Sequence, residues 1–349
     1  MERAPFVSVV TPFYNTAAYL KECIESVLAQ THEGFEYLLV NNASTDGSRE
    51  IAARYAARDS RIRLHDNEQF VDQVANYNGA LARISSESKY VKIVQADDAI
   101  YPECLARMVQ LAEREPTVGL VSSYWLEGDA LAGTGIPWRV ERLSGRDACR
   151  LMLLEGCFPI GSPSNVLYRA DIVRKRKPFY RPGRYHEDTE AAYEILLDYD
   201  LGFVHQVLTF CRTDNLSITN SVRDLNPFWL DYLLVVHTYG PRVLTPEEFF
   251  RRSKQVRTAY FRFLGRALLR LPGRRFWDYH RGGLATLGWK LRYWDLVPWA
   301  AGELVLLLLE PKTTMERVIA EWRRRTARRR ARSQPSAPKG GNAATQLDA

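Results

Sequence analysis

The segment from Tyr90 to Pro102, YVKIVQADDAIYP, limits the possible folds of this chain more than any other. Its mostly apolar first part, through Val94, is rich in β-branched residues and predicts a buried strand in a sheet covered on both faces. Two adjacent carboxylates, Asp97 and Asp98, follow directly. Open α/β sheets bind ligands at the carboxyl ends of their strands, and neighbouring like charges repel unless a cation lies between them. The pair therefore predicts a site for a divalent cation that holds a diphosphate.

A purely structural interpretation of the two carboxylates is also open. Asp97 can begin a turn, and Asp98 can cap a helix whose first turn contains Pro102. For an isolated pair of aspartates this interpretation is the more common one. The surrounding motifs therefore have to decide between the two.

Strands and helices alternate along the first part of the chain. Strands are predicted at Phe6–Val10, Tyr37–Val40, Arg61–Leu64, Val118–Ser122, Val166–Arg169 and Gly202–Arg212. Helices are predicted at Thr16–Gln30, Arg49–Arg58, Val71–Ile84, Glu103–Arg114 and Ser144–Glu155. Thr11 to Asn15 is interpreted as a turn. This alternation predicts an α/β fold with a parallel sheet and right-handed crossovers.

Three regions follow from the change in pattern along the chain. Residues 1–222 form the predicted α/β domain, and residues 223–332 form a helical region rich in Arg and Trp. Residues 333–349 lack apolar periodicity and are expected to be disordered.

Charge and cysteine content exclude several classes of protein. The net charge of +7 belongs to one segment, Lys312 to Arg332, which carries nine basic and two acidic residues. The rest of the chain is neutral, with 39 basic and 39 acidic residues. A neutral body argues against a nucleic-acid partner. The five cysteines contain no CxxC pair, which argues against a disulfide framework or a zinc site and favours a reducing cytoplasm. No apolar run near the C-terminus approaches the ~20 residues of a spanning helix.

Six fragments in order resemble a known family: VSVVTPFYN, SVLAQT, LLVNNASTDGS, NGA, QADD and HED. Over roughly residues 6 to 215 the chain is similar to family 2 glycosyltransferases with a GT-A fold. The resemblance implies a mixed, mostly parallel sheet with a helical C-terminal extension. It also implies a nucleotide-sugar donor, a divalent cation (Mn²⁺ or Mg²⁺) and inversion at the anomeric carbon of the sugar.

In this resemblance Asp98 is the metal ligand, and Asp97 contacts the ribose or shares the metal. The family often has a further Asp where this chain has Gln95, which supplies no charge. A divalent cation would stabilise the charge on the departing diphosphate. Arg212 resembles an arginine that closes over the diphosphate, and Asp214 stands where the family often has His.

The nucleotide would lie against the first loops. Thr11, Pro12 and Tyr14 follow the first strand, where Tyr14 can offer a ring to the base or pack under the next helix instead. Asn42 stands where the family usually has an acid that accepts a hydrogen bond from uracil, so a UDP-sugar is expected first and other bases stay open. Two further predicted nucleotide-sugar contacts are Asp46, which can also cap a helix, and Asn78.

The HEDTE run from His186 to Glu190 supplies the predicted base. An inverting transfer needs one carboxylate to take the proton of the acceptor hydroxyl. By resemblance that residue is Asp188, with Glu187 in a structural or acceptor-contacting role. The alternative is that these acids only favour the N-terminus of their helix through its dipole.

The expected acceptor is a saccharide or a lipid-linked saccharide of bacterial-type cell-surface polysaccharide or glycoconjugate synthesis. The basic C-terminal helix can lie on an anionic membrane surface, or it can cover the α/β core or meet a partner. The protein is expected in the cytoplasm, at the inner face of the membrane in the first case. A second functional interpretation is a non-catalytic nucleotide-sugar-binding or scaffolding relative, which Gln95, Asn41, Asn42 and Asp214 suggest.

Overall fold

The computed structural model describes residues 4–183, 185–213 and 224–309, and the chain divides into two compact units. The first unit contains residues up to Thr258 together with Arg274–Trp289, and the second contains Ala259–Gly273 and the residues from Lys290 onward. The predicted domain boundary after residue 222 stays a prediction. The region that follows it is helical, as predicted, but two of its helices belong to the first unit, α9 (Phe228–Val243) and α11 (Arg274–Thr286).

The first unit is built on one mixed sheet, which confirms the predicted fold class. Its strands are β1 (Val7–Phe13), β2 (Phe35–Asn41), β3 (Ile62–Asp66), β4 (Tyr90–Ile93), β5 (Ala99–Ile100), β6 (Val118–Glu127), β7 (Ala130–Ala132), β8 (Arg142–Leu143), β9 (Leu167–Arg169) and β10 (Asp200–Cys211). The order is β3-β2-β1-β4-β9-β6-β10-β5, with β7 beside β6 and β8 beside β10. The long pairings are parallel, and the short β9 lies antiparallel between β4 and β6. The carboxyl ends of β1, β4, β6 and β10 therefore meet at one edge.

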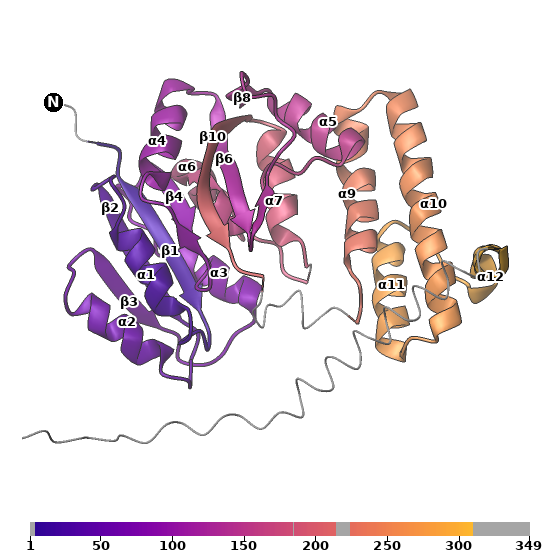
Figure 1. Cartoon of the computed structure of the whole chain (residues 1–349), viewed down its shortest axis with the longest axis horizontal. Helices are drawn as coiled ribbons and strands as arrows, with labels where there is room; N and C mark the ends of the chain where they lie inside the picture. The colour runs from indigo at the N-terminus through magenta and orange to yellow at the C-terminus, as the bar shows by residue number, and fades with distance from the viewer. Residues whose placement is uncertain (1–3, 184, 214–223, 310–349) are drawn as a thin grey trace, which may run out of the picture. The chain divides into compact units, whose positions relative to one another are not determined.

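Helices cover both faces of this sheet (Figure 1). They are α1 (Leu20–Leu28), α2 (Ser48–Ala56), α3 (Gln73–Leu81), α4 (Cys104–Arg114), α5 (Gly145–Glu155), α6 (Ala170–Lys175) and α7 (Glu187–Leu196). The apolar face of α4 is buried, and Ser144, the N-cap residue of α5, accepts a hydrogen bond from the Asp147 N–H. Amphipathic periodicity thus placed these helices against the sheet as expected.

The rest of the helical region consists of α10 (Pro246–Arg270) and α12 (Val297–Leu309). Within the second unit, Arg266 forms an ion pair with Glu303 of α12 at 2.7 Å. Of the helices in the described ranges, none combines the length and the apolar character needed to cross a membrane. The predicted basic segment 312–332 and the tail 333–349 lie outside the described residues.

The first strand is longer than the sequence predicted. β1 continues through Thr11 and Pro12 to Phe13, so the turn predicted from Thr11 begins only at Tyr14. Pairing with β4 ends at Val10, whereas pairing with β2 continues to Phe13. Beyond Val10 one side of β1 has no strand partner, and a proline is tolerated in such edge-like positions because it has no N–H to donate.

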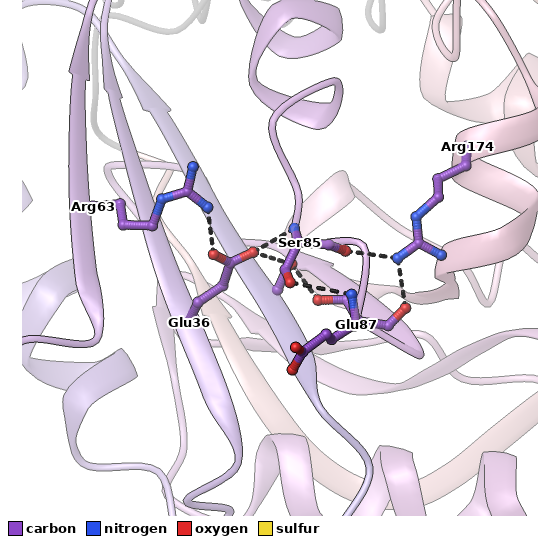
Figure 2. A network of polar contacts seen from close by, with 7 residues as sticks. Glu36, Arg63, Ser85, Glu87 and Arg174 are labelled. Atoms are coloured by element: carbon purple, nitrogen blue, oxygen red, sulfur yellow. Dashed lines mark hydrogen bonds and ion pairs between the residues drawn. The ribbon is translucent and has the colours of Figure 1, made fainter.

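A polar network around Glu36 of β2 connects neighbouring strands to the loop that precedes β4 (Figure 2). The buried Glu36 carboxylate accepts hydrogen bonds from the Ser85 N–H at 2.6 Å and the Ser8 hydroxyl at 2.5 Å, and it pairs with Arg63 of β3 at 2.7 Å. Arg174 of α6 donates to the Ser85 carbonyl at 2.7 Å from the other side. The loop that leads into β4 is therefore held to β1, β2 and α6.

We expect Glu36→Ala to lower the free energy of unfolding by about 2 kcal/mol, because the Ser85 N–H loses its buried acceptor. Urea denaturation monitored by circular dichroism measures this loss. Arg63→Ala is the matched control: it removes an exposed partner of the same carboxylate and should cost less than about 1 kcal/mol. Equal losses in the two variants would contradict the structural role given to Glu36.

Candidate active site

A cleft of about 760 Å³ opens where the carboxyl ends of β4, β6 and β10 meet. Its lining residues come from the ends of these strands and from the chain around α3, η1 (Pro163–Asn165), α7 and α11. They are Asp72, Gln73, Val74, Tyr77, Gln95, Asp97, Asp98, Glu127, Ser162, Pro163, Tyr180, Gly183, Tyr185, Glu187, Asp188, Cys211, Arg212, Thr213 and Tyr279. The cleft thus brings together the aspartate pair and the two acids of the HED motif, Glu187 and Asp188, which are far apart from it in the chain.

Asp98 is held in place by two hydrogen bonds. It is only 6% exposed; its Oδ2 accepts from the Ser164 hydroxyl at 2.6 Å, and its Oδ1 accepts from the Arg212 N–H at 3.1 Å. The helix after it, α4, begins at Cys104 with Glu103 at its N-cap. Asp98 is therefore not the helix cap that the structural interpretation of the pair required.

The surroundings of Asp98 disfavour its charged form. Burial and the neighbouring Asp97 raise the pKa of Asp98 to about 7, although the hydrogen bonds from Ser164 and Arg212 oppose this. Beneath the site, Lys92 is fully buried and donates to the Ser164 carbonyl at 2.6 Å. Burial lowers the pKa of Lys92. The carboxylate pair would gain from a cation that enters from the cleft side.

Arg212 connects the end of β10 to the segment after β4 and to the start of α1. Its guanidinium donates to the Asp97 carbonyl at 3.2 Å, pairs with Glu22 of α1 at 2.7 Å and stacks on the Tyr19 ring at 4.8 Å. This arginine lines the cleft beside the aspartates, and its closure over a diphosphate stays a prediction. Asp214, by contrast, lies outside the described residues.

Glu187 and Asp188 open α7 and face the same cleft. Burial, together with the charge of Asp188, raises the pKa of Glu187 to about 7. Burial also raises the pKa of Asp188, whose Oδ1 accepts from the Thr189 N–H at 2.7 Å. Both acids therefore lie partly buried at a wall of the cleft, and their role as base or as helix-dipole partners stays a prediction.

The protein side of a metal site would consist of hard oxygen donors. Asp97 and Asp98 supply carboxylates, and Gln95 lines the cleft beside them. The described part of the chain contains no cluster of three or more His, Cys, Asp or Glu that could hold a metal by itself. Such a donor set fits Mn²⁺ or Mg²⁺ held between a few carboxylates and the phosphates of a substrate.

Six of the predicted nucleotide contacts do not line this cleft: Thr11, Pro12, Tyr14, Asn42, Asp46 and Asn78. Thr11 is buried and donates to the Val94 carbonyl at 2.8 Å, and Asp46 accepts from the Ala17 N–H at 3.0 Å. Tyr14 is exposed and packs against Phe70 with ring centroids 4.7 Å apart. Contact of these residues with a nucleotide stays a prediction.

Two asparagines among them clamp backbone segments. Asn42 donates to the Val71 carbonyl at 2.8 Å and accepts from the Val71 N–H at 3.0 Å. Asn78 makes the same pair of bonds with Tyr180, both at 2.8 Å. Val71 and Tyr180 lead into segments that line the cleft, so these side chains shape its walls.

Sequence reasoning missed several lining residues. Tyr77 and Tyr180 are buried aromatic residues whose pattern is that of an ordinary core. Tyr279 lies on α11, far beyond the region that the motifs cover. Only Tyr185 carried a local signal, since it immediately precedes the HED motif.

Comparisons with known proteins identify relatives of this chain. The family model described as "Glycosyl transferase family 2" matches residues 8–176. Glycosyltransferase GlyG from Streptococcus pneumoniae is 26% identical over 231 residues, which cover 63% of this chain and 75% of GlyG.

Two similar solved structures show the fold. S. aureus TarS in complex with UDP-GlcNAc has a TM-score of 0.54 at 16% identity, covering 74% of this chain and 73% of that one. The mannosyltransferase PcManGT from Pyrobaculum calidifontis in complex with GDP-Man and Mn²⁺ has a TM-score of 0.54 at 18% identity. The match covers 90% of this chain and 84% of PcManGT. The predicted GT-A fold is confirmed by these likenesses.

The raised pKa of Glu187 predicts how stability depends on pH. An acid whose pKa is raised from 4.5 to about 7 on folding stabilises the fold below its unfolded pKa, and this contribution disappears as the pH rises through about 7. Glu187→Gln should therefore increase the free energy of unfolding relative to wild type by about 2 kcal/mol at about pH 8 and leave it unchanged at about pH 4.

Urea unfolding at both pH values measures this difference. Glu68→Gln, a change of the same type at an exposed position, is the control and should have no effect at either pH. A gain of the same size at both pH values for Glu187→Gln would show that burial of its charge is not the cause.

Proposed function

Because the chain belongs to glycosyl transferase family 2 through residues 8–176, we propose that it transfers a sugar from a nucleotide-diphosphate donor to a hydroxyl acceptor with inversion. The observation that carries this proposal is that Asp188 lines the same cleft as Asp97 and Asp98. A leaving-group site and a general base must face one another across the anomeric carbon, and the cleft offers carboxylates from two separate elements for these roles.

Asp98 and Asp97 would hold a divalent cation at the diphosphate end. When bound, Mn²⁺ or Mg²⁺ stabilises the negative charge of the departing nucleoside diphosphate. Ser164 and the Arg212 N–H orient the Asp98 carboxylate, and the Arg212 guanidinium adds positive charge beside it. PcManGT, which shares the fold, contains Mn²⁺ with its donor, and this supports the assignment.

Asp188 would accept the proton of the attacking hydroxyl. Its raised pKa makes it a better base than an exposed aspartate, because proton transfer is most efficient when the pKa of the base approaches the working pH. Glu187 lines the same cleft beside it and would contact the acceptor or adjust the local charge.

UDP-sugars are the first donors to test. TarS has been solved with UDP-GlcNAc and PcManGT with GDP-Man, so this fold accommodates more than one base. The Asn42 Oδ1 already accepts from the Val71 N–H and from the Asn67 amide, so it can accept a uracil N–H only if one of these two bonds is broken. Guanine and thymine donors therefore belong in the same panel.

The acceptor is proposed to be a saccharide or lipid-linked saccharide of cell-surface polysaccharide or glycoconjugate synthesis. Segment 312–332 carries a net charge of +7 and would attract an anionic membrane surface from the cytoplasmic side. The structure does not describe this segment, so its charge alone supports the assignment.

Asp188→Asn should lower the rate of sugar transfer by about 10²- to 10⁴-fold, because it removes the carboxylate proposed to take the hydroxyl proton. Release of nucleoside diphosphate from a panel of nucleotide sugars, with a mixture of glycosides as acceptors, measures the rate. Asp198→Asn, at the exposed end of the same helix region, is the control and should keep the wild-type rate. If wild-type protein binds a nucleotide sugar but releases no diphosphate, the non-catalytic interpretation is correct.

Removal of the cation should abolish donor binding. UDP with Mn²⁺ is expected to raise the melting temperature of the protein, since a ligand that binds only the folded state stabilises it. EDTA should remove this shift, and Asp98→Asn should reduce it while Asp198→Asn retains it. An undiminished shift in EDTA would exclude the metal-bridged mode of binding.

A further inference from the structure

The helical region after residue 223 reaches the cleft through a buried polar cluster. Asp231 of α9 is 6% exposed; its Oδ2 lies 3.0 Å from His186 Nδ1, and its Oδ1 accepts a hydrogen bond from the Tyr279 hydroxyl of α11 at 3.2 Å. His186 is the N-cap residue of α7 and directly precedes Glu187. One buried carboxylate therefore connects α9 and α11 to the wall of the cleft that carries the predicted base.

Two aromatic rings lie at this wall. Tyr185 and Tyr279 both line the cleft, with ring centroids 5.7 Å apart and planes inclined by 50°. Tyr185 is 39% exposed, so its ring can be covered by a ligand. Aromatic faces in clefts bind flat, apolar surfaces, and one face of a pyranose ring, which carries C–H groups, is such a surface.

The charge of the cleft selects among acceptors. Of the described lining residues, six are acidic (Asp72, Asp97, Asp98, Glu127, Glu187 and Asp188), and Arg212 is the single cationic one. Arg212 lies at the diphosphate end, beside Asp97. An acceptor that carries a carboxylate or phosphate near its reactive hydroxyl would meet like charge at Glu187 and Asp188.

We propose that Tyr185 and Tyr279 form the acceptor subsite, an aromatic platform for the C–H face of a neutral pyranose ring whose hydroxyl points toward Asp188. Asp231 keeps the Tyr279 ring in this position through its hydroxyl. The assignment rests on the proposed transferase function and adds to it the class of acceptor and the part of the chain that binds it.

Binding of simple glycosides tests the subsite directly. The probes are the neutral methyl glycosides of glucose, galactose, mannose and N-acetylglucosamine, and the anionic methyl glucuronide. Saturation-transfer NMR on the full chain, with UDP and Mn²⁺ present, measures binding of each probe. We expect at least one neutral glycoside to bind through the C–H protons of one ring face and the glucuronide to bind more weakly.

Three variants and one control test whether glycoside binding depends on the rings of Tyr185 and Tyr279. Tyr185→Ala and Tyr279→Ala should each weaken binding of the neutral glycoside by about fivefold, because each removes a stacking face. Tyr279→Phe keeps the aromatic ring and should weaken glycoside binding less than Tyr279→Ala does. Trp138→Ala, which removes a 72% exposed aromatic residue that does not line the cleft, should bind as wild type.

The outcomes separate the two proposals. Binding of no neutral glycoside, preference for the glucuronide, or unchanged binding in both Tyr185→Ala and Tyr279→Ala would overturn the acceptor subsite. Tyr185 is exposed and precedes its helix, so its variant remains informative even if Tyr279→Ala does not fold. Absence of diphosphate release from any donor overturns the proposed transferase activity instead, and it leaves the glycoside-binding result to stand by itself.

Discussion

The buried carboxylate of Asp98, directly beside Asp97, is the feature on which the rest of the cleft depends. A charge withdrawn from water next to another of the same sign is unfavourable unless other groups compensate for it. Ser164 and the Arg212 N–H supply hydrogen bonds, and the buried Lys92 holds Ser164 through its carbonyl. A divalent cation, as proposed above, would further stabilise this pair of carboxylates.

The sheet order explains why these groups meet. β9 lies antiparallel between β4 and β6, so the loop before it, which contains Ser164, returns to the carboxyl end of β4. β10 runs parallel to β6 and ends at the same edge, where Arg212 follows it. The network at Glu36 holds the segment that leads into β4, and this fixes the start of the strand that carries the aspartates.

The helices after residue 223 do more than extend the α/β unit. Asp231 ties α9 and α11 to His186, and Tyr279 brings an aromatic ring to the cleft. The cleft is thus lined by the ends of strands and, through Tyr279, by α11.

The sequence by itself determined the local elements and the residues that end them. Apolar patterns identified the longer strands and the helix α4, and the acids after β4 marked the edge of the sheet where the cleft lies, since both signals are local in the chain; the short strands β5, β7 and β8 were not predicted. The tertiary structure alone decided which distant groups share the cleft: Asp188 with Asp98, and Tyr279 with both. It also decided that Asn42 binds Val71, because the partner of a polar side chain depends on long-range packing and periodicity does not encode it.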